Sequence, residues 1–157
     1  MPDMQLKRFE KSMVDEIVTL FRETVLRVNR KDYSKEQVKE WAANAQTTEE
    51  WVARLDRSLT YVAFMKGEMV GFSNLTEDGL IDLLYVHKSH QGEGVASNLI
   101  ELLEAEAVTL GISLLTVEAS ITARPFFLSQ GYEVQQDQSK LIAGVEFINY
   151  RMIKKLK

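Results

Sequence analysis

Apolar residues in the first third of the chain recur every three or four positions, the spacing of one helix face. After a short strand predicted over residues 5–9, this pattern runs through Val14, Ile17, Val18, Phe21, Val25 and Val28. A second helix is predicted to begin at Ser34, where Ser34 and Gln37 fit the capping-box pattern. A third, short helix is predicted to be capped by Thr48. The chain up to about residue 55 is therefore predicted to be mostly helical.

From residue 59 onward the pattern changes to short apolar runs, which are typical of strands. Lys66-Gly67 marks a tight hairpin turn between the first two runs. A long helix is predicted to end at Gly111, and a shorter one carries Pro125 in its first turn, where proline is tolerated. The predicted elements here are strands at 59–65, 69–75 and 80–86, a helix at about 95–110, a strand at 113–119, a helix at 122–130, and strands at about 132–138 and 145–152.

The order of these elements predicts the fold class. A strand and helices are followed by an antiparallel meander, a βαβ crossover, another helix and a closing pair of strands. This order indicates a mixed sheet covered by helices, of the α/β or α+β class. No internal repeat, low-complexity tract or linker is visible, so residues 1–157 are predicted to form a single domain.

Composition narrows the class of protein. The chain has 157 residues, of which 45% are hydrophobic and 27% charged, as in ordinary soluble globular proteins. No stretch approaches the ~18 apolar residues of a membrane helix, and residues 1–5 lack the features of a secretory signal. The absence of cysteine removes disulfides, thiolate nucleophiles and Cys-containing metal sites. We therefore expect a cytoplasmic protein with no membrane partner and no metal.

Charge argues against a nucleic-acid partner. The chain carries 19 basic and 23 acidic residues, giving a net charge of −4. The basic residues are scattered, apart from a short tail at 151–157. A surface that neutralises phosphates needs a concentrated basic patch, so nucleic-acid binding is not expected.

The most informative segment is 85–97, where a predicted strand leads through a loop with two glycines directly into a helix. At such a junction several backbone N–H groups have no intrahelical partner, and the helix dipole adds partial positive charge. Gly92 and Gly94 let an anion approach the main chain and permit positive φ. The segment therefore indicates a pyrophosphate site, although two glycines before an ordinary helix would give the same pattern.

A dinucleotide-binding fingerprint is the alternative for this segment. Gly92, Gly94 and the position of Ser97 match Gly-x-Gly-x-x-Gly except at the third glycine, and Glu118 stands near the place of the ribose-binding acid. However, the motif follows a meander instead of a first strand. Roughly 60 residues remain after it, too few for a full doubly wound sheet. These features count against nicotinamide-dinucleotide binding.

Two motifs resemble those of the GCN5-related N-acetyltransferase (GNAT) family. Gln91-Gly-Glu-Gly-Val-Ala96 matches the family's Gln/Arg-x-x-Gly-x-Gly/Ala signature, and Ala123-Arg-Pro-Phe-Phe-Leu-Ser-Gln-Gly-Tyr132 is similar to its Ala-x-x-Phe-Tyr-x-x-x-Gly-Phe helix. The resemblance covers essentially the whole chain. The segments 83–87 and 117–120 are also similar to a bacterial subgroup of small-molecule acetyltransferases.

The resemblance implies a mostly antiparallel sheet of about seven strands with four to five helices, and acetyl-CoA as the cofactor. By position, Leu84, Tyr85 and Val86 would pair their main chain with the pantetheine arm where the sheet splays apart. Ser120 takes the place of a common cofactor-binding asparagine, and Phe127 also belongs to the cofactor site. The pyrophosphate would be bound by the loop residues Gln91, Gly92, Glu93, Gly94, Val95, Ala96 and Ser97.

The chain departs from the family at the residue that protonates the leaving thiolate. Many members use a tyrosine there, and Phe127 cannot donate a proton. Another hydroxyl can take over, with Tyr85, Tyr132 and Tyr150 as candidates, or the thiolate leaves unassisted. This departure favours the alternative of a non-catalytic acyl-CoA-binding or sensing domain.

Glu118 and Asp82 are the candidate general bases, because each is an acid inside an otherwise apolar strand. Strand alternation puts Asp82 and Tyr85 on opposite faces unless a bulge intervenes. His87 and His90 belong to a polar loop and are expected to be solvent-exposed rather than catalytic.

The acceptor pocket is expected to come from the first two helices and their connection, where Asn29, Tyr33 and Trp41 are the candidate substrate-binding residues. We expect acetyl transfer to a primary amine of a small molecule, by direct attack in a ternary complex. The resemblance also allows for a homodimer.

Overall fold

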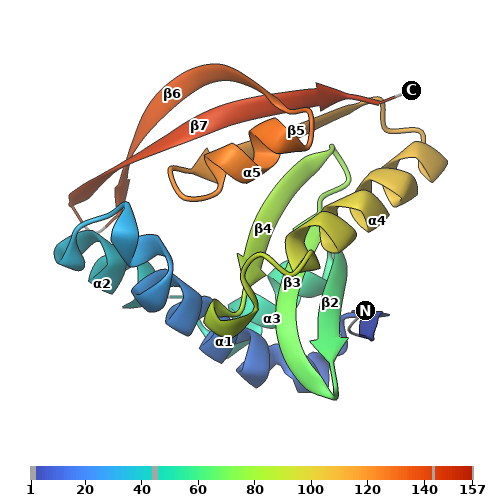
Figure 1. Cartoon of the computed structure of the whole chain (residues 1–157), viewed down its shortest axis with the longest axis horizontal. Helices are drawn as coiled ribbons and strands as arrows, with labels where there is room; N and C mark the ends of the chain where they lie inside the picture. Colours follow the sequence, from blue (N-terminus) through green and yellow to red (C-terminus); the bar gives the residue numbers. More distant parts are fainter. Residues whose placement is uncertain (1–2, 44–45, 143, 157) are drawn as a thin grey trace.

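The computed structural model describes residues 3–43, 46–142 and 144–156. These residues form a seven-stranded sheet and five α-helices (Figure 1), which confirms the predicted mixed fold. The strands are β1 (Met4–Arg8), β2 (Leu59–Met65), β3 (Glu68–Leu75), β4 (Leu80–Val86), β5 (Leu114–Ser120), β6 (Glu133–Ile142) and β7 (Val145–Lys155). The helices are α1 (Val14–Arg27), α2 (Lys35–Ala43), α3 (Thr48–Asp56), α4 (Val95–Thr109) and α5 (Arg124–Ser129), with 3-10 turns at Lys11–Met13, Asn29–Lys31 and Lys88–His90.

The sheet has the strand order β1-β2-β3-β4-β5-β7-β6. β4 and β5 run parallel, whereas the other neighbouring strands run antiparallel. Within the described residues, β4 and β5 pair only at Leu80 with Thr116 and at Ile81 with Val117. The two strands therefore separate after Ile81, and the rest of β4 pairs with β3 alone.

Two apolar cores lie on opposite faces of the sheet. On one face α1, α2 and α3 pack around Phe21, Trp51 and Phe72, all nearly inaccessible to solvent. On the other face α4 packs against β2, β3 and β4, and α5 against β5 and β6, with Leu103 and Phe127 buried between them and the sheet. Full burial of such a side chain stabilises the fold by roughly 1.5–3 kcal/mol. Each core includes residues from both sides of the opening between β4 and β5.

The helix caps in the structure largely agree with those predicted from the sequence. Ser34 and Gln37 form the predicted capping box, since the Gln37 N–H donates to Ser34 Oγ (3.0 Å) and the Ser34 N–H to Gln37 Oε1 (2.8 Å). The prediction that Thr48 caps α3 is wrong by one residue, because the cap is Thr47. Glu50 lies three residues after Thr47 and completes a second capping box with it.

The hairpin turn after β2 has the predicted form. Lys66 and Gly67 both have positive φ, 53° and 77°, as a two-residue hairpin loop requires. None of the helices in the described ranges is both long enough and apolar enough to span a lipid bilayer.

Candidate active site

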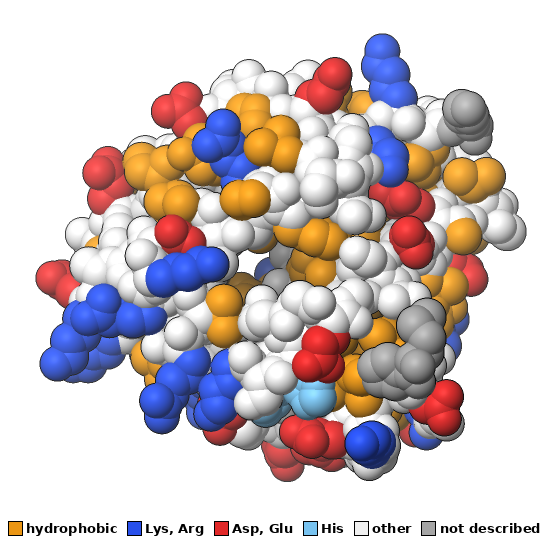
Figure 2. Space-filling view, viewed as in Figure 1, with side chains coloured by type: hydrophobic (Ala, Val, Ile, Leu, Met, Phe, Trp, Pro, Cys, Tyr) orange, Lys and Arg blue, Asp and Glu red, His pale blue; other side chains and the backbone are white. Residues whose placement is uncertain are grey.

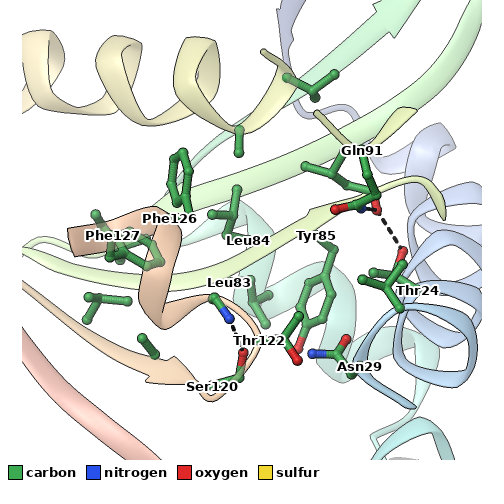
Figure 3. A pocket seen from close by; sticks show the side chains of 18 of the residues that line it. Thr24, Asn29, Leu83, Leu84, Tyr85, Gln91, Ser120, Thr122, Phe126 and Phe127 are labelled. Carbon is green, nitrogen blue, oxygen red and sulfur yellow. Dashed lines mark hydrogen bonds between the residues drawn. The ribbon is translucent and has the colours of Figure 1, made fainter. Parts of the chain in front are cut away.

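A cavity of about 580 Å³ opens where β4 and β5 separate. Its walls come from α1, α2, β4, the loop after β4, the first turn of α4, β5 and α5. The surface is hollowed near the centre of the view in Figure 2, and Figure 3 shows side chains from the two faces of the sheet meeting there. The cavity brings together residues that lie more than one hundred positions apart, from Thr24 to Phe127.

The edge of β4 supplies the middle of the cavity wall. The N–H of His87 donates to the carbonyl of Val70 in β3 at 2.8 Å. Because the direction of backbone groups alternates along a strand, the N–H groups of Leu84 and Val86 face the opposite edge, which β5 has left. An extended ligand that carries amides can pair with such an edge as an additional strand does.

The Val86 carbonyl at this edge already has protein partners. It accepts hydrogen bonds from Gln91 Nε2 (2.7 Å) and from Thr24 Oγ1 (3.3 Å). Gln91, predicted to bind the cofactor, thus turns its amide inward and fixes the start of the loop. Thr24 is a site residue that the sequence reasoning missed, because it interrupts the apolar stripe of α1 and carries no chemistry of its own.

The glycine loop leads into α4 in the predicted way. Gly92 and Gly94 both adopt positive φ, 75° and 84°, and Gly94 is the N-cap of α4. Among the described residues no side chain caps this helix, so N–H groups of its first turn are left for a ligand. Gly92, Gly94, Val95, Ala96 and Ser97 line the cavity. Glu93 instead directs its carboxylate to His90 Nδ1, at 3.0 Å.

The loop between β5 and α5 closes the other wall. Ser120 lines the cavity, and its Oγ accepts the N–H of Ala123 at 3.0 Å, which shapes the turn into α5. Phe127 borders the cavity but is 1% exposed, with its ring in the core between Phe126 and Tyr132 (centroids 5.1 Å from each). This wall thus combines the aromatic rings of α5 with the hydroxyl group of Ser120.

Of the three tyrosines considered as proton donors, the structure brings only Tyr85 to the described wall of the cavity. Tyr132 is buried and donates its hydroxyl to Glu104 Oε2 at 2.7 Å. Tyr150 lies beneath the guanidinium of Arg124, 4.7 Å from its ring centroid. The rings of Tyr132 and Tyr150 therefore pack against other parts of the protein, outside the cavity.

Tyr85 is held between Phe21 and Phe72, with centroid distances of 5.0 and 5.7 Å. Burial raises the pKa of its phenol well above the usual value of 10.0, while the neighbouring Trp41 and Arg54 side chains oppose this shift in part. The hydroxyl therefore stays protonated and acts as a hydrogen-bond donor across the ordinary pH range.

Asp82 lies at a bulge in β4. Asn74 pairs with Leu83, and Leu75 pairs with Ile81, so Asp82 has no cross-strand partner. The bulge shifts the alternation and places Asp82 on the same face as Tyr85, the condition under which both can face an acceptor. Both Asp82 oxygens accept hydrogen bonds from Arg54, from Nε at 2.7 Å and from Nη2 at 2.8 Å.

Glu118 is the more accessible of the two candidate bases. It is exposed on β5, lines the cavity and accepts one hydrogen bond, from Gln138 Nε2 at 3.2 Å. Asp82, in contrast, is bound on both oxygens by a guanidinium, which also raises the pKa of Arg54. The structure thus brings both carboxylates to one cavity, and Glu118 is the one without a guanidinium partner among the described residues.

The acceptor end of the cavity lies beside α1 and α2. Asn29 is buried and lines the cavity, as does Trp41. Figure 3 shows the ends of Asn29, Tyr85 and Thr122 converging. Thr122 Oγ1 is buried without a hydrogen-bond partner in the described structure. Thr122 was missed by the sequence reasoning because a loop threonine after a strand gives no distinctive pattern.

Tyr33, predicted to contact the substrate, does not border the cavity. Its hydroxyl donates to the Ile148 carbonyl (3.0 Å) and accepts the Ile121 N–H (2.8 Å), which ties the 3-10 turn after α1 to β7 and to the loop after β5. The side chain is buried and does not border the cavity. Tyr33 therefore positions the wall on which Trp41 packs (ring centroids 5.2 Å apart).

The cavity has an acidic bias. Its charged lining residues are Asp82 and Glu118, with His90 at the loop, and no Lys or Arg borders it within the described ranges. Arg54 stands behind Asp82 and neutralises that carboxylate. The end of the cavity at the glycine loop thus presents backbone N–H groups, whereas the rest presents carboxylates, neutral polar groups and aromatic rings.

Comparison with known proteins identifies the class. The sequence matches the acetyltransferase (GNAT) domain over residues 29–154, so the chain belongs to the GNAT family of acetyltransferases. An uncharacterized N-acetyltransferase of Escherichia coli (strain K12), YafP, is 31% identical over 153 residues, which cover 97% of this chain and 96% of YafP.

Solved structures agree with this assignment. A GCN5-related N-acetyltransferase from Rhodopseudomonas palustris superposes with a TM-score of 0.93 at 34% identity, covering 99% of this chain and 96% of that one. The PaiA N-acetyltransferase of Thermoplasma acidophilum, solved in complex with coenzyme A, has a TM-score of 0.82 at 16% identity over 98% of this chain and 99% of its own. The latter similarity shows the fold alone.

Proposed function

We propose that the chain transfers an acetyl group from acetyl-CoA to the primary amine of a small molecule. The observation that carries this proposal is the continuity of one cavity. It runs from the glycine loop and the uncapped start of α4, along the open edge of β4, to two carboxylates. Each part matches one part of the reaction: the pyrophosphate, the pantetheine amides and the acceptor amine.

The residues present fit acetyl-CoA. Backbone N–H groups of Gly92 to Ser97 would bind the pyrophosphate without a Lys or Arg. The open N–H groups of Leu84 and Val86 would pair with the pantetheine arm, since the Val86 carbonyl is already occupied by Gln91 and Thr24. Ser120 and Phe127 would form the wall beyond the thioester.

The transfer itself forms one bond and breaks one. The amine nitrogen attacks the thioester carbonyl carbon, the carbon–sulfur bond breaks, and the products are an amide and the CoA thiol. The bound ammonium loses one proton before attack and a second as the amide forms; Glu118 is the proposed acceptor, directly or through water, and one of the two protons ends on the CoA thiolate by way of solvent. Asp82 is proposed to orient Arg54 and the floor of the cavity. The protonated hydroxyl of Tyr85 is proposed to donate a hydrogen bond to the departing thiolate.

The charge of the cavity indicates which amines fit. Glu118 attracts a cationic ammonium, whereas Asp82 is already paired with Arg54, and the ring of Trp41 adds an aromatic face. A carboxylate or phosphate on the acceptor would find no cationic side chain among the described lining residues. We therefore propose an amine acceptor that carries no anionic group, which excludes free α-amino acids.

Matched pairs of amines test this proposal. Tyramine and tyrosine, like putrescine and ornithine, differ only by a carboxylate, and release of the CoA thiol reports turnover of each. We expect kcat/KM for the amine to exceed that for its amino acid by at least about tenfold, a difference of ~1.4 kcal/mol. Equal turnover within the pairs would leave the acetyltransferase in place and overturn the charge argument. No turnover with any amine would count against catalysis itself.

A non-catalytic acyl-CoA sensor is the second candidate, and Phe127 is the observation that favours it. Acetyl-CoA would then bind, as measured by calorimetry, without amine-dependent thiol release. NAD provides the control ligand, because a preference for NAD over acetyl-CoA would support the dinucleotide alternative.

A further inference from the structure

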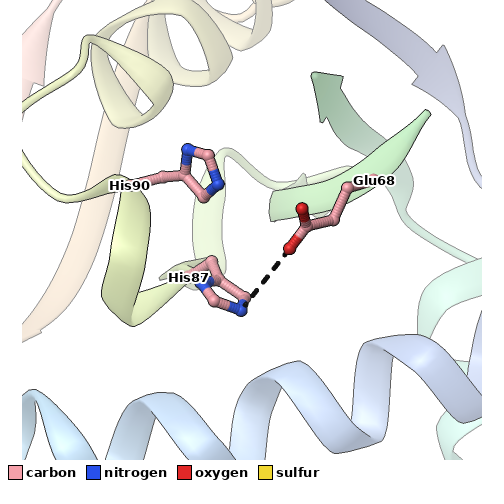
Figure 4. A group of neighbouring side chains, drawn as sticks. All are labelled: Glu68, His87 and His90. Atoms are coloured by element: carbon pink, nitrogen blue, oxygen red, sulfur yellow. Dashed lines mark ion pairs between the residues drawn. The ribbon is translucent and has the colours of Figure 1, made fainter. Parts of the chain in front are cut away.

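The two histidines of the chain come together on the loop that precedes the glycine motif. His87 stands directly before the 3-10 turn Lys88–His90, and His90 ends it. Glu68, the first residue of β3, faces them from the neighbouring strand (Figure 4). One ligand atom from each of the three residues lies within 4.8 Å of the others.

We propose that Glu68, His87 and His90 form a binding site for a divalent transition metal of the Zn²⁺ type. Imidazole nitrogens and one carboxylate are a ligand set that Zn²⁺ accepts, with water in the fourth position. The chain has no cysteine and only these two histidines, so all of its nitrogen ligands for such a metal converge at this point. The prediction of no metal, made from the lack of cysteine, did not consider this pair.

His90 is already oriented as a metal ligand. Its Nδ1 lies 3.0 Å from Glu93 Oε1, and because a carboxylate only accepts, Nδ1 carries the proton. Nε2 is then the unprotonated nitrogen with a lone pair for a metal. A carboxylate behind a ligating imidazole is the usual arrangement in metal sites, where it fixes both the tautomer and the ring.

His87 must exchange one contact when a metal binds. Its Nδ1 accepts the Ser89 N–H at 3.0 Å, so Nε2 carries the proton and points toward Glu68 Oε1 at 3.8 Å. A metal at Nε2 replaces that proton, and the ring proton moves to Nδ1 at the expense of the Ser89 hydrogen bond. His90 and Glu68 are thus already placed for the metal, whereas His87 has to rearrange. Because this rearrangement costs a hydrogen bond, we expect a micromolar rather than a nanomolar Kd for Zn²⁺.

The surroundings favour a cation. Glu68 and His87 also line a second cavity of about 330 Å³ together with Asp15, Glu16 and Glu23 of α1. Glu23 pairs with Lys88 at 3.7 Å, which leaves an excess of negative charge at the mouth of this cavity. Such a field raises the local concentration of cations and gives the metal an entry path from solvent.

Titration of Zn²⁺ into the full, untagged chain, followed by calorimetry, tests the proposal directly. We expect one Zn²⁺ per chain, and Co²⁺ at the same site should give the visible absorption bands of a coordinated ion. His90→Asn and His87→Asn should each weaken Zn²⁺ binding by about tenfold or more. Metal binding is measured on the free protein, so its failure is separate from any failure of the acetyltransferase proposal.

Two glutamate variants make the test specific. Glu68→Gln removes a ligand whose side chain is 60% exposed, so the fold is expected to survive, and it should reduce affinity severalfold. Glu23→Gln removes a carboxylate from the same cavity without touching the three ligands, so it should weaken Zn²⁺ binding less than Glu68→Gln does. Absence of Zn²⁺ binding, or equal weakening in both glutamate variants, would overturn the site, because the second result indicates a diffuse acidic surface.

Discussion

At the scale of single residues, we expect one cavity carboxylate, Glu118, to affect catalysis and the other, Asp82, to affect the stability of the fold. Glu118→Gln removes the proposed base from an exposed position, so kcat should fall by roughly 100-fold with the melting temperature unchanged. Asp82→Asn leaves the mostly buried Arg54 guanidinium with a poorer partner, which should cost about 1–3 kcal/mol in free energy of unfolding. Urea unfolding and steady-state kinetics on both variants check this, and a larger stability loss in Glu118→Gln would contradict the assignment.

Tyr85 gives a second test at this scale. Tyr85→Phe keeps the ring between Phe21 and Phe72 but removes the hydroxyl, so kcat is expected to fall by about 10- to 100-fold with little loss of acetyl-CoA affinity. Because burial raises the pKa of this phenol, the hydroxyl remains protonated to above pH 10. The basic limb of the pH–rate profile should therefore be the same in Tyr85→Phe and in the unaltered chain. A basic limb that disappears in the variant would show that Tyr85 titrates during catalysis.

At the scale of elements, the start of α4 depends on close contact with β3. A Cβ added at Gly71 would lie 2.8 Å from Val95 Cγ1 and 3.1 Å from the Tyr85 carbonyl oxygen. Gly71→Ala should therefore push α4 away from the sheet, lower the free energy of unfolding by roughly 1–3 kcal/mol and weaken acetyl-CoA binding. Gly67→Asn is the control, since Gly67 has open space around it and Asn tolerates its positive φ. Equal acetyl-CoA affinities in the two variants would contradict the role of Gly71.

The elements show what local sequence could and could not predict. The order of strands and helices, the hairpin at Lys66-Gly67 and the glycine loop follow from periodicity and turn chemistry, which are local properties. The bulge at Asp82 could not be predicted from the sequence, because nothing in the apolar run 80–86 indicates it. The hydrogen bonds of the Tyr33 hydroxyl to Ile121 and Ile148 could not be predicted either, because these partners lie more than eighty residues away in the chain.

The same limit applies to the cavity. Its cofactor end was predicted because Gly92, Gly94 and their helix form a contiguous motif. Its acceptor end is assembled from Asn29, Trp41 and Thr122, which lie on three separate elements. Tertiary packing alone brings these together, so only the structure shows that no Lys or Arg is among the described residues that line the cavity. The nature of the acceptor is accordingly a property of the folded cavity and cannot be read from a motif.

At the scale of the whole molecule, the proposed metal site and the cofactor cavity share a segment. His90 borders the cavity, and the next residue, Gln91, holds the Val86 carbonyl at the edge of β4. A metal at His87 and His90 would fix the segment that joins β4 to the glycine loop. Acetyl-CoA would then bind to a loop that is already ordered, which reduces the entropy lost on binding.

This coupling is expected to be reciprocal, as linked equilibria must be. With Zn²⁺ at saturation the Kd of acetyl-CoA should fall by about fivefold, and saturating acetyl-CoA should lower the Kd of Zn²⁺ by the same factor. In Glu68→Gln, at Zn²⁺ concentrations that no longer fill the site, the acetyl-CoA affinity should not respond. Calorimetric titrations in both orders measure the two factors. Unequal factors would indicate that Zn²⁺ also binds at a second site, such as the CoA phosphates. Identical acetyl-CoA affinities with and without Zn²⁺ would show that the two sites act independently despite their shared loop.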